Sequence, residues 1–299
     1  MSSVTSPQKD FDLRAAALAL LLAALWGANP AAIKIGLVDA PPLRLAWLRF
    51  VLGGLLNLAW GGWTGALATL RIERHEWRPL AILGLLFTLQ IGLLNIGTNL
   101  TTASRSTVLL NAYTVHTVVL AHFQIPGDRL TARKLMGTLI AYVGIVLLFF
   151  PEARSGDITF LGDLLVSVSA LLLGERTIYL ARAVQRMDPL KLLLAQAVVG
   201  SACFLGVSLW VEAGVPYRWT TPLTLVILYQ GLVVAGFNFT ASLWLLKHYR
   251  PSALAGFFLT TPIFGVLLSA ALVGEPLTRT LLLSSLLVAA GIGLTSRAA

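Results

Sequence analysis

The sequence matches itself at a fixed offset of 147 residues. No gap is needed between the first apolar segment and the last. Glycine and proline, the residues with the narrowest structural roles, recur in register: Gly27 with Gly174, Pro42 with Pro189, Gly53 with Gly200, Gly84 with Gly231 and Gly144 with Gly291. This self-similarity predicts two copies of one structural unit, so the fold has to build both halves from the same elements.

Composition places these copies in a membrane. The chain is 57% hydrophobic and 12% charged, with a mean hydropathy of +0.82, whereas a soluble domain carries about 25% charged residues. A membrane-spanning helix needs about 20 predominantly apolar residues. Ten segments meet that requirement: 13–34, 43–63, 79–99, 103–123, 132–151, 158–180, 189–211, 221–246, 252–273 and 276–296.

The predicted fold is an all-α membrane protein with ten transmembrane helices in a single membrane domain, 1–299. Each half, 13–151 and 158–296, holds five segments. Because five is odd, the second half has to be inverted relative to the first. Inverted repeats are typical of secondary transporters, whose substrate site lies at the repeat interface.

The distribution of Lys and Arg predicts the orientation. With both termini in the cytoplasm, the cytoplasmic segments hold 14 of these residues and the outer segments hold six, as the positive-inside rule requires. The net charge of +9 is spread over the loops rather than gathered in a stripe. We therefore expect no nucleic-acid partner.

The sequence indicates neither a metal site nor a cofactor. The single Cys203 excludes an internal disulfide and a multi-cysteine metal site. A membrane-embedded enzyme acting on lipids is disfavoured, because the chain has no HExxH motif, no aspartate-rich motif and no P-loop.

Polar residues within the spans are candidate site residues. Each of them has an alternative role in hydrogen bonding between helices. In the first segment, Trp26 and Asn29 precede Pro30, a predicted break and hinge. In repeat register, Asn29 falls on Arg176. A second predicted hinge, Pro262, follows Thr260 in the ninth segment.

Glu175 is the carboxylate most clearly inside a span, and Tyr179 follows it at i+4 on the same helical face. It is the candidate proton carrier, and its alternative is a structural ion pair or an orientation toward the cytoplasmic surface. Proton coupling and facilitated diffusion both stay open. Arg49 could attract an anionic substrate, but outward snorkelling is the favoured interpretation.

Twelve residues form the predicted substrate site: Trp26, Asn29, Gln90, Asn111, Tyr113, His116, Glu175, Tyr179, Gln230, Asn238, Phe239 and Thr260. The fifth and tenth segments carry few polar residues but contain Gly137, Gly144 and Gly291. We expect these two segments to form a scaffold or a dimer contact, because glycines let helices approach closely.

The stretch SALAGFFLTTPIFGVLLSAALVGEPLT, 252–278, resembles the repeat unit of the drug/metabolite transporter superfamily of the EamA type. WGANP, 26–30, is similar to the first-helix signature of that family, and PGDRLT, 126–131, is a weaker first copy. Asp128 stands where the family commonly has Glu, and Val115 stands where it commonly has Pro.

This resemblance implies a bacterial inner-membrane carrier, a monomer or homodimer in contact with lipid, that exports small metabolites. Within the superfamily the chain resembles exporters of aromatic and other neutral amino acids. Export of other metabolites or drugs is the alternative.

Overall fold

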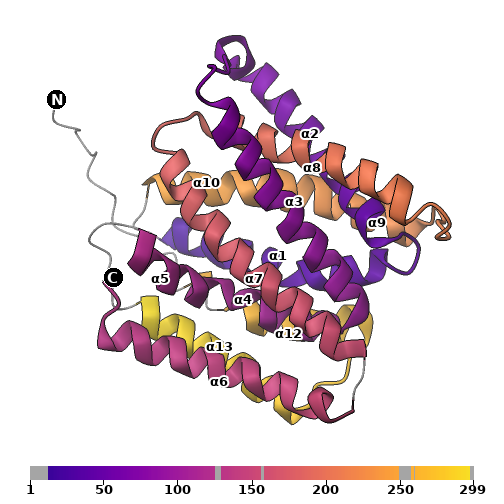
Figure 1. The fold of residues 1–299 in the computed structure, drawn as a ribbon, viewed down its shortest axis with the longest axis vertical. Helices are drawn as coiled ribbons and strands as arrows, with labels where there is room; N and C mark the ends of the chain where they lie inside the picture. Colours follow the sequence, from indigo (N-terminus) through magenta and orange to yellow (C-terminus); the bar gives the residue numbers. More distant parts are fainter. Residues whose placement is uncertain (1–12, 125–128, 156–157, 249–256, 259, 297–299) are drawn as a thin grey trace.

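The computed structural model describes residues 13–124, 129–155, 158–248, 257–258 and 260–296 (Figure 1). Every regular element in these ranges is a helix. The elements are α1 (Leu13–Gly36), α2 (Pro42–Trp63), the 3₁₀ helix η1 (Ala66–Thr69), α3 (Trp77–Leu100), α4 (Ala103–Asn111), α5 (Tyr113–Gln124), α6 (Ala132–Ser155), α7 (Ile158–Ala183), α8 (Pro189–Val211), α9 (Thr221–Leu228), the π-helix η2 (Tyr229–Asn238), α10 (Phe239–His248), α12 (Thr261–Val273) and α13 (Arg279–Ser296).

Seven helical stretches in the described ranges are long and apolar enough to cross a membrane. The chain is therefore a multi-pass membrane protein. The other three predicted spans are not described as single helices of that length and hydropathy. Segment 103–123 is divided between α4 and α5, segment 252–273 is described mainly as the 13-residue α12, and segment 276–296 is the 18-residue α13. The number ten remains a prediction.

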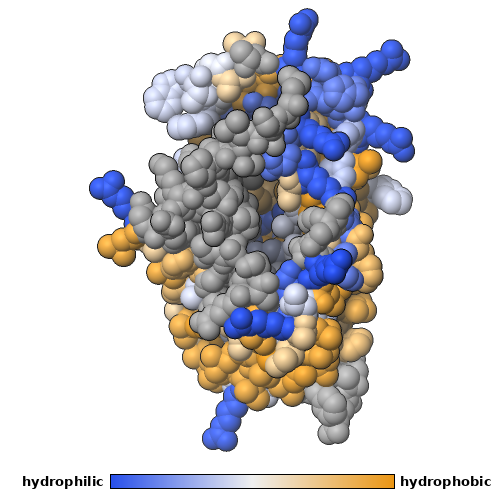
Figure 2. Space-filling model, turned by 90° about the vertical axis from the view of Figure 1, so that its left-hand side faces the viewer, coloured by the Kyte–Doolittle hydropathy of each residue, from blue (hydrophilic) through white to orange (hydrophobic). Residues whose placement is uncertain are grey.

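The outer surface of α6 is apolar, as contact with lipid requires. Leu139, Val143 and Val146 are each more than half exposed. Figure 2 shows the end of the molecule at which α1 begins: hydrophilic residues gather on this face, and hydrophobic residues cover much of its flank. An exposed apolar surface of this kind marks a membrane-facing region.

Helices from the two halves pack directly on each other. The repeat partners α2 and α8 are in contact, as are the repeat partners α6 and α13, and α3 lies along α7 (Figure 1). One large apolar cluster includes Leu45 and Phe87 from the first half and Phe204 and Val266 from the second. The core therefore lies between the halves.

At one end of the bundle, two carboxylates cap helices of the opposite half. Glu212 accepts hydrogen bonds of 2.8 and 3.0 Å from the N-terminal amides of α2. Glu275 accepts bonds of 2.7 and 2.8 Å from the N-terminal amides of α4. The first amides of a helix have no partner within it and carry partial positive charge, so a carboxylate stabilises them.

The opposite end has its own polar contacts. Lys191 of α8 lies 2.8 Å from Glu76, and its hydrogen bond holds the pKa of the Glu76 carboxyl below the ordinary value. Tyr179 of α7 donates a 3.0 Å bond to the carbonyl of Pro79. These hydrogen bonds therefore join helix ends that are predicted to lie on the same side of the membrane. Which side faces the cytoplasm remains a prediction.

The structure corrects the break expected at Pro30, because α1 continues through this residue to Gly36. Proline removes a single amide donor, and here the turns on either side stay helical. Pro262 lies in the first turn of α12, where its missing amide is not needed, and its role as a hinge remains a prediction.

An unexpected interruption divides the fourth predicted span. The amide of Ala112 bonds to the carbonyl of Leu109 at 3.2 Å, an i→i−3 turn between α4 and α5. Residues 103–124 contain no proline, so the interruption forms without one. Next to it, the Asn111 side chain donates to the carbonyl of Thr107 at 2.8 Å. Such local bonds compete with regular helix geometry.

The contact between α6 and α13 depends on two glycines. A Cβ atom on Gly291 would lie 2.5 Å from the carbonyl oxygen of Gly137, and one on Gly137 would lie 2.7 Å from that of Gly291. Both distances are shorter than van der Waals contact. The expected packing role of these glycines is confirmed within the monomer.

We expect Gly291→Val to lower the free energy of unfolding by about 1–3 kcal/mol, because the added side chain forces two backbones apart. The measurement is the thermal unfolding midpoint in detergent. Gly206→Val is the matched control, because a Cβ at Gly206 meets no atom within 4 Å. Equal midpoints for the two variants would contradict this packing.

Candidate functional site

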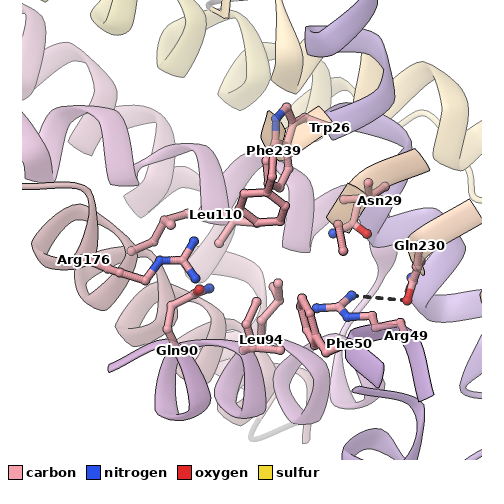
Figure 3. Close-up of a pocket in the computed structure, with 14 residues that line it drawn as sticks. Trp26, Asn29, Arg49, Phe50, Gln90, Leu94, Leu110, Arg176, Gln230 and Phe239 are labelled. Carbon is pink, nitrogen blue, oxygen red and sulfur yellow. Dashed lines mark hydrogen bonds between the residues drawn. The ribbon is translucent and has the colours of Figure 1, made fainter. Parts of the chain in front are cut away.

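A cavity lies between helices of both halves (Figure 3). It holds about 390 Å³ of atom-free space, including the part open to solvent. The lining residues come from α1, α2, α3, α4, α7, η2 and α10: Trp26, Asn29, Arg49, Phe50, Gln90, Ile91, Leu94, Leu110, Leu173, Arg176, Gln230, Val234, Ala235 and Phe239.

Aromatic side chains form part of the wall. The rings of Trp26 and Phe239 meet edge to face with centroids 5.0 Å apart, and Phe50 lies across the cavity from them (Figure 3). Trp26 and Asn29 are three residues apart on α1 and therefore share a face. This face presents an apolar ring and an amide to the same space.

Three buried amides line the cavity. Asn29, Gln90 and Gln230 are at most 4% exposed. Asn29 Oδ1, Gln90 Oε1 and Gln230 Nε2 have no hydrogen-bond partner among the described residues. A buried polar atom without a partner costs about 1–3 kcal/mol, so these atoms favour binding of a polar ligand.

Two arginines also line the cavity, and each is 3% exposed. Arg49 does not snorkel outward, contrary to the favoured interpretation of the sequence. It donates a 3.2 Å hydrogen bond to Gln230 Oε1, which holds its side chain in the interior. Arg176, the repeat partner of Asn29, faces the same space from α7 (Figure 3).

The π-helix η2 supplies Gln230, Val234 and Ala235 to the cavity. π-helical turns are rare and are frequent at functional sites. The hydrophobic pattern of 221–246 predicts only an ordinary helix. We find no sequence signal that indicates the wider turn.

The structure brings five of the twelve predicted site residues together in the cavity: Trp26, Asn29, Gln90, Gln230 and Phe239. Nine other lining residues were absent from the prediction, among them Arg49, Phe50 and Arg176. A charged residue well inside a span is itself a signal for a site, so both arginines could have been found. Phe50 carries no such signal.

The other seven predicted residues do not line this cavity. Four of them donate hydrogen bonds to backbone carbonyls: Asn111 to Thr107, Tyr179 to Pro79, Asn238 to Leu22 and Thr260 to Phe257. Glu175 accepts a hydrogen bond from Gln124, and the His116 ring lies 5.6 Å from that of Tyr142. Tyr113 packs against the large apolar cluster. These contacts match the alternative of bonding within and between helices, and a role in transport remains a prediction.

A second cavity of about 300 Å³ continues from the first, with which it shares Phe50, Ala235 and Phe239. It follows α2 through Gly53 and Asn57, toward the end predicted to face the cytoplasm. The two cavities are therefore adjacent, and the second lies between the first and that end of α2.

Helices from both halves of a membrane protein thus line one cavity, and secondary transporters typically have their site at the interface between repeats. The model of the EamA-like transporter family matches residues 13–150 and again residues 160–297. The chain belongs to the EamA-like transporter family, within the drug/metabolite transporter superfamily. The resemblance noted in the sequence is confirmed.

Relatives across the full length carry transporter names. The uncharacterized transporter YoaV of Bacillus subtilis is 25% identical over 275 residues, 90% of this chain and 91% of YoaV. A probable amino-acid metabolite efflux pump of Escherichia coli K12 is 26% identical over 285 residues, 92% of each chain. A solved crystal structure, 20% identical, covers 96% of this chain with a TM-score of 0.69, which supports the fold.

The geometry predicts that a carboxylate beside Arg49 stabilises the substrate-free protein. We expect Gln230→Glu to raise the free energy of unfolding by about 1–3 kcal/mol, because the hydrogen bond to Arg49 becomes charge-assisted. The measurement is the thermal unfolding midpoint in detergent.

Gln196→Glu is the matched control. Gln196 is 5% exposed and lines the second cavity, which no arginine lines. The same change there should lower the midpoint, because it buries a charge without a cation. A fall in both variants would contradict the assignment of Arg49 as an unneutralised charge.

Proposed function

We propose that this protein is a secondary transporter that exports aromatic and other neutral amino acids, and metabolites derived from them, across the bacterial inner membrane. The observation that carries the proposal is the cavity between the two halves. Its walls combine aromatic rings, buried amides and guanidinium groups. The printed name of the E. coli relative, a probable amino-acid metabolite efflux pump, adds support for this class of substrate.

The proposed architecture is ten spans in two inverted five-helix repeats, with both termini in the cytoplasm. The family model matches twice, with starting residues that differ by the same 147 positions as the internal repeat. An odd number of spans in each repeat inverts the second copy, and the excess of basic residues in alternate loops supports this orientation.

Each part of such a substrate has a matching group in the cavity. A carboxylate fits the guanidinium groups of Arg49 and Arg176, which can donate two hydrogen bonds to one carboxylate. An apolar or aromatic side chain fits the wall formed by Trp26, Phe50 and Phe239. The unpartnered amide oxygens of Asn29 and Gln90 are available to hydrogen-bond donors of the substrate.

Alternating access requires the helices that line the cavity to move relative to one another. We propose Pro30 and Pro262 as the flexing points of α1 and α12. Proline weakens a helix locally even where the helix continues, because one backbone hydrogen bond is missing. The turn between α4 and α5 is a third position at which a lining helix can bend.

The transport proposal predicts that the purified protein in liposomes accelerates the movement of labelled aromatic and neutral amino acids, or of their metabolites, down a concentration gradient. The physical reason is alternating access to the cavity between the two halves. The measurement is the initial rate of efflux, with empty liposomes as the control. Rates equal to those of empty liposomes across several such classes would contradict the function.

Glu175 is the proposed proton carrier if export is driven by protons. It lies outside the cavity, bonded to Gln124 near the end of α5. We expect Glu175→Gln to remove the response of transport to an imposed pH gradient and to spare exchange at equal pH, because the amide cannot lose a proton. The measurement is the efflux rate with and without the gradient.

Asp188→Asn is the matched control, since Asp188 is a carboxylate at the N-terminus of α8. Its gradient response should stay unchanged. A gradient response that persists in Glu175→Gln would remove Glu175 from coupling. A wild-type protein with no response would favour facilitated diffusion.

A further inference from the structure

The two arginines of the cavity face each other across it. Arg49 extends from α2 and Arg176 from α7, and the end groups of both point into the space between them (Figure 3). Their 3% exposure means that water solvates very little of either side chain. Guanidinium remains protonated in proteins, so both positive charges persist in the interior.

Their neighbours satisfy the hydrogen-bonding groups only in part. Arg49 donates to Gln230 Oε1, and its guanidinium lies 4.5 Å from the centre of the Phe50 ring, but its Nε has no partner. Arg176 lies 5.1 Å from the centre of the Phe87 ring, and its Nε and Nη1 have no partner in the described structure. Both guanidinium groups therefore have N–H donors available to a ligand in the cavity.

None of the carboxylates whose side chains the structure describes neutralises these charges. All eight have other partners: Asp39 with Thr220, Glu73 with His75, Glu76 with Lys191, Asp163 with Arg105, Glu175 with Gln124, Asp188 with the amide of Leu190, Glu212 with α2 and Glu275 with α4. None of them lines the cavity.

Two unneutralised charges in one buried cavity are unfavourable. Burial of an ion without a counter-charge costs several kcal/mol, and like charges in a medium of low polarity repel each other. Buried charges are normally paired. In a cavity open to a transported ligand, the missing negative charge can come from that ligand.

The rest of the wall restricts the ligand further. The edge-to-face pair of Trp26 and Phe239, together with Ile91, Leu94 and Val234, provides an apolar surface. An inorganic anion would leave this surface without contacts. An organic anion fills it with its apolar body and places its acidic group between the arginines.

We propose that this site selects organic carboxylates with an aromatic or branched apolar body and no positive charge, in preference to the corresponding zwitterionic amino acids and amines. The proposal rests on the transport function proposed above, because it concerns the same cavity. A carboxylate between the guanidinium groups offsets one of the two positive charges and attracts both, whereas the ammonium of a zwitterion adds a third positive charge to the same space.

The test uses three ligands that share a phenyl body and differ in charge: N-acetylphenylalanine as the anion, phenylalanine as the zwitterion and phenylalaninamide as the cation. Dissociation constants are measured by titration calorimetry on the full chain in detergent at pH 7. We expect the anion to bind at least about tenfold more tightly than the zwitterion, the effect of roughly one charged hydrogen bond, and the cation not to bind.

Variants locate the selectivity. Arg49→Gln and Arg176→Gln should each bring the ratio of anion to zwitterion affinity toward one, because each removes a positive charge. Arg49→Lys and Arg176→Lys keep the charge and should keep the preference for the anion. The matched control is Arg186→Gln, which removes an exposed charge between α7 and α8 and should leave the ratio unchanged. If a Gln variant does not fold, the Lys variants and the wild-type ligand series still decide the question.

Two outcomes overturn different proposals. Phenylalanine that binds as tightly as N-acetylphenylalanine, or a ratio that is insensitive to both arginines, would refute anion selectivity and leave the transport function standing. Transport of neither compound in liposomes, with no binding of either, would refute the proposed function itself.

Discussion

The positive charge of two buried guanidinium groups is the constraint on which the centre of this protein depends. Arg49 and Arg176 lie on helices of different halves and line one cavity. Each charge destabilises the empty cavity, and a ligand whose carboxylate lies between both guanidinium groups stabilises it. Since both halves contribute an arginine, the same ligand also bridges the two moving parts of a transporter.

Three of the described acidic residues join the two halves near the ends of helices. Glu212 and Glu275 cap helix N-termini at one end, and Glu76 pairs with Lys191 at the other. These contacts hold helices of opposite halves together at helix ends. The cavity between the ends is left with amides, aromatic rings and cations. Contacts near the helix ends therefore hold the two halves together, and the central cavity is the candidate binding site.

The helical fold, the duplication and the family could be predicted from the sequence, because long apolar segments and the repeat register can be read from a single sequence. The sequence also placed Trp26, Asn29, Gln90, Gln230 and Phe239 among the candidates, and all five line the cavity. The prediction placed Glu175 in the site and left Arg176 out. Adjacent residues on a helix point about 100° apart, and the sequence does not reveal which of the two faces the cavity. The π-helix and the turn at Ala112 arise from local hydrogen bonding, which apolar patterning does not encode.

The most direct test is to locate a bound ligand. A crystal structure with N-acetyl-4-bromophenylalanine, recorded at the bromine absorption edge, would show the position of the ring by anomalous scattering. We expect the bromine among Trp26, Phe50 and Phe239, with the carboxylate within hydrogen-bond distance of Arg49 and Arg176. A bromine outside this cavity, or a carboxylate of the chain itself between the two arginines, would contradict the central role of the buried charges.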